Sequence, residues 1–189
     1  MSKIFIISGP SGCGKGTIID KLLQNQELNL YWAKSYTTRP IRESDRKENK
    51  YLFTTVKEFK EIERRGEILE SNLYNGNWYG TSRMEIQNAL KKGVNVIKDI
   101  DVHGAMAYTK MFQNLVLIFI KSDLVDIETR LQNRQQNSEE EIQNRLAEAI
   151  KEMEFAKHYD YVVENKQNHL DEAITEISNI IKKENNERN

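Results

Sequence analysis

The chain has little cysteine, almost no net charge and no long apolar run, and each of these absences excludes a class of protein. Cys13 is the only cysteine, so an intrachain disulfide is excluded. The 28 lysines and arginines are balanced by 29 aspartates and glutamates, which argues against a basic nucleic-acid-binding surface. No segment approaches the ~20 apolar residues of a membrane span, and the apolar run after Lys3 ends at Ile7, too early for a signal peptide. We therefore expect one cytoplasmic domain of 189 residues that binds neither nucleic acid nor membrane.

A glycine-rich turn near the N-terminus is the most informative feature that the chain does have. It joins an apolar, strand-like run to a helix-like stretch and reads Gly9-Pro10-Ser11-Gly12-Cys13-Gly14-Lys15-Gly16-Thr17. In such a P-loop the glycines let backbone N–H groups point inward, where they and the positive end of the helix bind oligophosphate oxygens. Lys15 can then neutralise charge on the β- and γ-phosphates. The turn therefore predicts a binding site for a nucleoside triphosphate.

The rest of the chain alternates between short apolar runs and amphipathic stretches. The apolar runs predict strands at Lys3–Ser8, Val94–Ile100, Leu115–Lys121 and Tyr161–Glu164. The amphipathic stretches predict helices at Thr17–Asn25, Arg83–Lys92, Ala105–Phe112 and Val125–Asn133, one that opens with a capping box at Ser138, and a last one from Leu170. This alternation predicts an α/β fold with a parallel sheet, headed by the P-loop and flanked by helices. The polar tail from Lys182 is expected to fray.

Residues 35–82 interrupt this alternation. They contain short strand-like pieces at Ala33–Thr37, Tyr51–Thr54 and Glu67–Ser71 around a helix-like stretch at Lys57–Arg65. We therefore expect a small α+β lobe inserted into the sheet domain.

The inserted lobe carries a set of side chains suited to a nucleotide. Arg39 and Arg42 are three residues apart, so both can reach one phosphate, and guanidinium groups match phosphate oxygens. The hydroxyls of Tyr51 and Tyr79 can donate to the same phosphate. Glu70 has no cationic neighbour in sequence, and one carboxylate can accept the adjacent N1–H and N2–H₂ donors of guanine. Adenine has an acceptor at N1, so such a site rejects it.

Five motifs in family order, spread over nearly the whole chain, give it a specific resemblance. They are Ser-Gly-Pro-Ser-Gly-x-Gly-Lys at 8–15, Thr-Thr-Arg-x-x-Arg at 37–42, Gly-Asn-x-Tyr-Gly-Thr at 76–81, Asp-Ile-Asp-Val-x-Gly at 99–104, and Arg-Leu…Arg…Arg-Leu at 130–146. The chain resembles the guanylate kinases, which use ATP to phosphorylate GMP. The resemblance implies ATP and GMP as substrates, with dGMP a further candidate acceptor, and Mg²⁺ as cofactor.

The resemblance also implies a role for each matching residue. Those expected to bind GMP are Ser35, Arg39, Arg42, Tyr51, Glu70, Tyr79, Thr81, Asp99 and Asp101, of which Ser35, Glu70 and Thr81 would read the base. Those expected to bind ATP, beside the P-loop, are Arg130 and Asn165. Those expected to stabilise the transferring phosphoryl are Lys15, Arg39, Arg134 and Arg145. Gly16 stands where the strict P-loop motif has a hydroxyl ligand for Mg²⁺, so the expected metal contacts are Thr17 and Asp101, through water if not direct.

Within the single domain 1–189 we expect a core (1–34, 83–123 and 157–189), a GMP-binding lobe (35–82) and a lid (124–156). Two departures from the family pattern are His103, where glutamine is common, and a lid without glycines around Arg134. Two alternatives therefore stay open: a kinase for another nucleoside monophosphate, or a catalytically weakened binding module of the same fold. The sequence leaves a monomer and a homodimer equally open.

Overall fold

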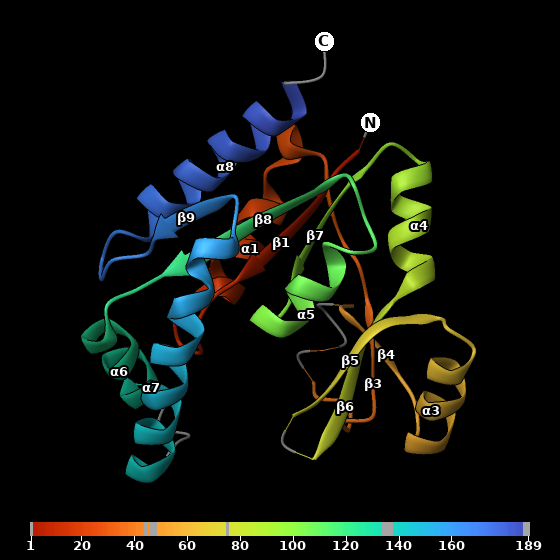
Figure 1. Cartoon of the computed structure of the whole chain (residues 1–189), viewed down its shortest axis with the longest axis horizontal. Coiled ribbons are helices and arrows are strands. Elements are labelled where there is room, and N and C mark those ends of the chain that lie inside the picture. The colour runs from red at the N-terminus through yellow and green to blue at the C-terminus, as the bar shows by residue number, and fades with distance from the viewer. Residues whose placement is uncertain (1, 44, 46–48, 75, 134–137, 187–189) are drawn as a thin grey trace.

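The computed structural model describes residues 2–43, 45, 49–74, 76–133 and 138–186, which form two sheets with helices around them (Figure 1). The larger sheet has five strands in the order β2-β7-β1-β8-β9, all parallel. Their bounds are β1 Ile4–Ser8, β2 Leu30–Trp32, β7 Asn95–Asp99, β8 Leu115–Lys121 and β9 Tyr161–Glu164. The predicted parallel sheet is confirmed. Only its edge strand β2 is absent from the sequence-based prediction, because three residues are too few to show a pattern.

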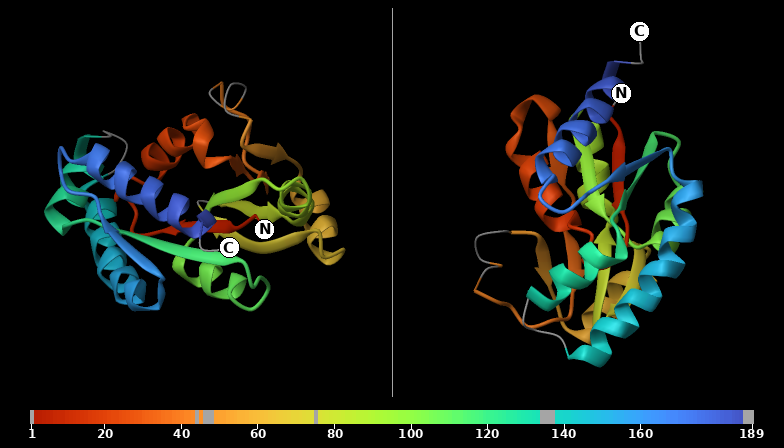
Figure 2. Two further views of the ribbon diagram at one scale, coloured as in Figure 1. Left: turned by 90° about the horizontal axis from the view of Figure 1, so that it is seen from above. Right: turned by 90° about the vertical axis from the view of Figure 1, so that its left-hand side faces the viewer.

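Helices cover both faces of this sheet (Figure 2). On one face, α1 (Lys15–Gln24) and α8 (Leu170–Asn186) pack on a cluster that includes Phe5 and Ile7. On the other, α4 (Arg83–Lys91) and α5 (Val102–Tyr108) pack on a cluster that includes Ile4 and Ile6. Every residue of β1 is buried, as a strand with two covered faces requires. The P-loop thus leaves the sheet from a rigid central strand.

The inserted lobe has its own four-stranded sheet, in the order β4-β3-β6-β5. The bounds of its elements are β3 Ser35–Thr37, β4 Tyr51–Phe53, β5 Ile68–Tyr74, β6 Asn77–Ser82 and helix α3 Val56–Arg64. β6 was missing from the sequence-based prediction, although its residues had been singled out as a motif. It lies between β3 and β5 and pairs with both in antiparallel orientation, so it connects them within the sheet.

The segment expected to form the lid contains two helices. α6 (Leu124–Asn133) packs on α7 (Glu139–Met153) through Ile127, Leu131, Ile142 and Ala149. The predicted capping box is confirmed, since the Ser138 hydroxyl accepts from the Glu141 amide and the Glu141 carboxylate accepts from the Ser138 amide. A short 3₁₀ turn, η2 (Glu154–His158), leads from α7 to β9.

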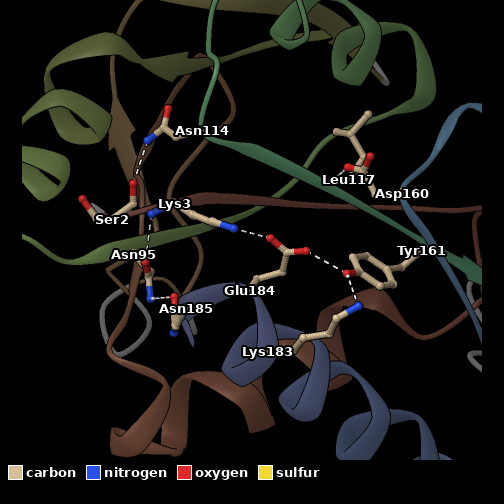
Figure 3. A network of polar contacts seen from close by, with 10 residues as sticks. All are labelled: Ser2, Lys3, Asn95, Asn114, Leu117, Asp160, Tyr161, Lys183, Glu184 and Asn185. Atoms are coloured by element: carbon tan, nitrogen blue, oxygen red, sulfur yellow. Dashed lines mark hydrogen bonds and ion pairs between the residues drawn. The ribbon is translucent and has the colours of Figure 1, made fainter. Parts of the chain in front are cut away.

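The expected fraying from Lys182 is wrong, because α8 continues to Asn186. Figure 3 shows why. Glu184 pairs with Lys3 at the start of the chain and accepts from the Tyr161 hydroxyl of β9 at 2.7 Å. The Asn95 amide at the start of β7 donates to Asn185 at 3.1 Å. The last turns of α8 therefore contact β7, β9 and the residue that precedes β1. No helix in the described part of the chain is long and apolar enough to cross a membrane.

Candidate active site

The P-loop bends in a way that only glycine allows. Gly14, the N-cap of α1, has a φ of 97°, and a Cβ there would lie 2.5 Å from the side-chain nitrogen of Asn165. A Cβ on Gly9 would lie 2.3 Å from the carbonyl oxygen of Ile120 in β8. The loop therefore packs directly on the backbone of the sheet, with the first N–H groups of α1 turned toward its hollow.

Lys15 begins α1, and its ammonium folds over the loop. It donates to the Gly9 carbonyl and to the Pro10 carbonyl, the latter at 3.0 Å, and lies 3.8 Å from the Cys13 sulfur. All of these acceptors are uncharged. The Cys13 side chain is fully buried, and this burial raises the pKa of its thiol.

Two residues predicted to bind ATP hold the back of the P-loop. The Asn165 side chain, only 2% exposed, donates to the Cys13 carbonyl at 2.8 Å. Arg130 of α6 donates to the same carbonyl at 3.3 Å and to the Asn165 carbonyl at 3.0 Å. The Ser122 hydroxyl also donates to the Asn165 carbonyl. In this conformation both residues fix the shape of the loop through its backbone.

Arg145 of α7 connects the P-loop to the inserted lobe. One of its terminal nitrogens lies 3.5 Å from the hydroxyl of Ser11 in the P-loop, and the other lies 3.3 Å from the hydroxyl of Tyr74 in β5. Tyr74 lines the cavity described next. A cation from the lid segment therefore stands between the two regions that carry nucleotide-binding motifs. Arg134, the other predicted lid arginine, lies outside the described residues.

A cavity of about 350 Å³ opens between the lobe and the carboxyl end of β7. Its walls combine seven residues singled out in the sequence with others that were not; they are Ser35, Tyr51, Glu70, Asn72, Tyr74, Tyr79, Gly80, Thr81, Lys98, Asp99, Ile100 and Asp101. The structure therefore brings most of the residues expected to bind GMP to one cavity, whereas Arg39 and Arg42 are not among its lining residues.

Glu70 of β5 is held in this cavity by two hydroxyls. Thr81 and Tyr108 each donate to its carboxylate at 2.6 Å, one to each oxygen. Burial raises the pKa of Glu70, and these two hydrogen bonds and the charge of Lys98 work against that rise. The pKa of the Tyr108 hydroxyl is also raised, by its own burial and by the neighbouring carboxylate. Each carboxylate oxygen retains acceptor capacity, so a second pair of donors can bind from the cavity side.

Arg39 is oriented by a partner that the sequence did not reveal. Its two terminal nitrogens donate to the two oxygens of Asp45, both at 2.7 Å, and one also donates to the Pro40 carbonyl. The guanidinium lies 5.0 Å from the centre of the Tyr51 ring, and Arg39 is only 8% exposed. Hydrogen bonding from Arg39 lowers the pKa of Asp45 to about 2.

The Asp45 contact leaves one edge of the Arg39 guanidinium available. Among the described residues, the Nε–H and the neighbouring outer N–H of Nη2 have no partner, and together they form the fork that suits a phosphate. Arg42 is exposed, and its hydrogen bonds with Asp45 come from its backbone: its amide donates to the carboxylate at 2.6 Å and its carbonyl accepts from the Asp45 amide at 3.1 Å. The two arginines therefore differ, since one is fixed and the other projects into solvent.

The acidic residues at the end of β7 are placed differently from each other. Asp101 is the N-cap of α5; it accepts from the amides of His103 and Gly104, and from the Asn72 side chain at 3.1 Å. Asp99 is exposed and pairs in register with Ile7, two residues before the P-loop. Thr17 is exposed in the first turn of α1. Among the described residues there is no cluster of three acidic, histidine or cysteine side chains for a metal.

A P-loop and a carboxylate-bearing cavity are therefore joined by one arginine, and comparison with known proteins agrees with this arrangement. The family model described as guanylate kinase matches residues 1–184. The chain belongs to the guanylate kinase family.

Individual relatives within this family are similar over almost the whole chain. The chain is 37% identical over 183 residues to the guanylate kinase of Mesoplasma florum, a match that covers 96% of this chain and 61% of that protein, so this chain spans about three fifths of that relative. It is 38% identical over 183 residues to the guanylate kinase of Escherichia coli (strain K12), covering 96% of this chain and 87% of that protein. The crystal structure of guanylate kinase from Anaplasma phagocytophilum aligns with a TM-score of 0.76 at 30% identity, over 97% of this chain and 86% of that one.

Three further residues contact Arg39 or Glu70 or line the cavity in this member of the guanylate kinase family, and the sequence did not point to any of them. Asp45 follows Arg39 by six residues, a spacing that has no meaning outside the folded loop. Tyr108 lies at the end of a helix, where an aromatic residue is normally interpreted as part of the hydrophobic core. Lys98 stands within an apolar strand, and an isolated lysine in such a run was the one available signal.

Proposed function

We propose that the protein transfers the γ-phosphoryl of ATP to GMP, giving ADP and GDP. The observation that carries this proposal is the position of Arg145, which contacts both the P-loop at Ser11 and the lobe cavity at Tyr74. A site for a nucleoside triphosphate and a site for a purine monophosphate then share one cation between them. Membership of the guanylate kinase family supports the same reaction.

In the proposed complex, the P-loop amides and Lys15 bind the triphosphate. The free edge of Arg39, with Arg42, Tyr51 and Tyr79, binds the phosphate of GMP. Glu70 accepts the N1–H and N2–H₂ groups of guanine while Thr81 and Tyr108 hold the carboxylate in place. Ser35, which lines the same cavity, faces the base as well.

The chemistry needs no general base, since the acceptor is a phosphate oxygen that is already ionised at neutral pH. Alignment and charge neutralisation therefore supply the catalysis. Lys15 and Arg145 neutralise charge on the phosphoryl as it moves, and closure of the lobe and lid excludes water that would otherwise hydrolyse ATP. Arg134 is assigned the same role as Arg145 from the sequence motif alone.

The residues near the P-loop fit a hydrated Mg²⁺ held mainly by nucleotide phosphates. Mg²⁺ in phosphoryl-transfer sites keeps several waters and needs only one or two protein oxygens. Thr17 and Asp101, whose Oδ2 accepts from Asn72 alone, would provide them, and Asp99 beside the start of the P-loop is a further carboxylate. When bound, the ion neutralises charge on the β- and γ-phosphates.

The test is an ADP-release assay with ATP and Mg²⁺ in which GMP, dGMP, AMP, CMP and UMP are compared as acceptors. We expect turnover with GMP, and with dGMP if the ribose 2′-hydroxyl is not read. Turnover with AMP in place of GMP would overturn the assignment of Glu70 as base reader. Folded protein that binds GMP but turns over no acceptor would favour a binding module. The core, lobe and lid boundaries, a cytoplasmic location, and the choice between monomer and homodimer stay predictions of the sequence.

A further inference from the structure

Lys98 is a buried cation in the wall of the GMP cavity for which the proposed reaction, as described so far, has no use. It lies in β7, is only 3% exposed and lines the cavity together with Glu70, Ser35 and Thr81. Among the described residues no oxygen accepts a hydrogen bond from its ammonium, whose direct contact is the face of the Trp32 ring, 4.1 Å from the ring centre. Burial lowers the pKa of Lys98, while the charges of Asp99 and Glu70 favour its protonated form.

The Lys98 ammonium has N–H donors to offer to a ligand in the cavity. A cation–π contact attracts the charge of an ammonium but does not use its N–H donors. An acceptor that enters the cavity next to Glu70 can bind these donors, so the wall favours a ligand that presents acceptor and donor groups side by side.

Guanine presents such an edge. Its O6 and N7 are acceptors, and the N1–H and N2–H₂ donors adjoin O6 along the other edge, whereas adenine has an amino donor in the position of O6. The hydroxyl protons of Thr81 and Tyr108 are already donated to Glu70, so neither hydroxyl donates to O6 in this arrangement. Other hydroxyl and amide donors line the cavity, but among its described lining residues Lys98 is the only cation.

We propose that Lys98 is a specificity-determining residue that donates to O6 of the purine, beside the N1–H and N2–H₂ groups read by Glu70. The inference rests on the proposed function, because it presumes that the cavity binds GMP. The ammonium and the carboxylate then form a complementary pair for guanine and a doubly mismatched pair for adenine. Lysine bound to guanine O6 and N7 is also a common specific contact in protein–DNA recognition.

The experiment removes the donor from the protein and weakens the acceptor on the ligand. Binding of GMP, 6-thio-GMP and IMP is measured by calorimetry on the wild type, on Lys98→Met and on the control Lys50→Met. Methionine keeps most of the side-chain volume. Lys50 also approaches the Trp32 ring, at 5.3 Å, but does not line the cavity. 6-Thio-GMP replaces O6 by a poorer acceptor, and IMP lacks only the 2-amino group.

We expect Lys98→Met to weaken GMP binding about 10- to 100-fold, as expected for loss of a hydrogen bond from a charged donor. Binding of 6-thio-GMP should fall far less, so that the preference for GMP over 6-thio-GMP largely disappears. The preference for GMP over IMP should be unchanged, because Glu70 reads the amino group, and Lys50→Met should leave both preferences as in the wild type. Thermal unfolding of Lys98→Met should occur at the wild-type temperature or above, since a desolvated charge has been removed.

Two results would overturn the inference: wild-type affinity for GMP in Lys98→Met, or an equal loss for GMP and 6-thio-GMP, which would indicate a structural or long-range electrostatic role. Should Lys98→Met fail to fold, the wild type alone decides, because indifference between GMP and 6-thio-GMP would refute an O6 contact. A wild type that binds no GMP would refute the proposed function itself. GMP turnover with unchanged preferences in the variant would refute only the role of Lys98.

Discussion

Replacing Glu70 by glutamine separates base recognition from stability, because the two should change in opposite directions. The carboxylate accepts from the hydroxyls of Thr81 and Tyr108 at 2.6 Å and, in the proposed complex, from N1–H and N2–H₂ of guanine. A glutamine amide has one oxygen and one NH₂ group, so its NH₂ must face either a protein hydroxyl or a guanine donor. Hydroxyls can rotate to accept, whereas the guanine donors cannot.

The loss can be estimated from these contacts. A hydrogen bond to a charged group is worth about 1.5–3 kcal/mol, and the variant loses the charge for both guanine donors and the geometry for at least one. We expect kcat/KM for GMP to fall about 10²- to 10³-fold, mostly through KM, and the preference for GMP over AMP to fall with it. Because burial raises the pKa of Glu70, the ionised side chain opposes folding at neutral pH, so Glu70→Gln should be at least as stable as the wild type.

The pH dependence provides a second measurement. GMP needs the ionised carboxylate, and the raised pKa means that wild-type affinity should begin to fall, on acidification, at a higher pH than an ordinary glutamate would cause. Glu70→Gln should lack this fall. Glu67→Gln is the matched control, since Glu67 pairs with Arg65 on the surface of the lobe, at 2.6 Å. Unchanged discrimination between GMP and AMP in Glu70→Gln would refute the reasoning.

Four other substitutions test the cations of the site. Lys15→Met should lower kcat at least about 10²- to 10³-fold. It should cause no loss of thermal stability, because the ammonium bonds only P-loop groups. Near-normal turnover would show that Lys15 is not part of the mechanism. Asp45→Asn should raise KM for GMP about tenfold, because Arg39 loses one of two charge-assisted bonds, and an unchanged KM would mean that Arg39 needs no such support. Since the pKa of Asp45 is about 2, this pair should persist at every pH above about 4 and weaken only below it. Arg39→Lys should impair GMP binding more than Arg42→Lys, since a lysine cannot bind Asp45 and phosphate through two forks; equal effects in a titration of both variants would contradict the distinction.

What the sequence predicted well is what short-range patterns determine. The strands of the central sheet are unbroken apolar runs, and the capping box at Ser138 is a local motif, so both were located correctly. Strand β2 has three half-buried residues, and β6 contains polar and aromatic residues with a glycine, so neither carries a recognisable period. The end of α8 is fixed by contacts of Glu184 and Asn185 with strands distant in sequence, which local composition cannot reveal.

The same division applies to the site. Arg39, Glu70 and the P-loop were found because motif and spacing name them, and the structure brings Glu70 and most of its expected neighbours to one cavity. The contacts that tune these residues were not found. Asp45 reaches Arg39 through a loop, and Tyr108 reaches Glu70 across the junction of the lobe and α5. Such pairs depend on the tertiary arrangement of loops, sheets and helices, which a local stretch of sequence does not reveal.

The cations of the site differ in whether a carboxylate already binds them. We therefore expect them to contribute differently to substrate binding. The hydrogen-bond acceptors of Lys15 are uncharged, so none of them neutralises its charge at short range. Arg39 is held by a carboxylate, so it supplies orientation while Asp45 cancels much of its field. Among the described residues the side chain of Arg42 forms no ion pair, so this exposed arginine can help to balance the charge of the GMP phosphate. We infer that binding through Arg42 is the salt-sensitive part of GMP recognition and that the Arg39 contact, shielded from solvent, is not.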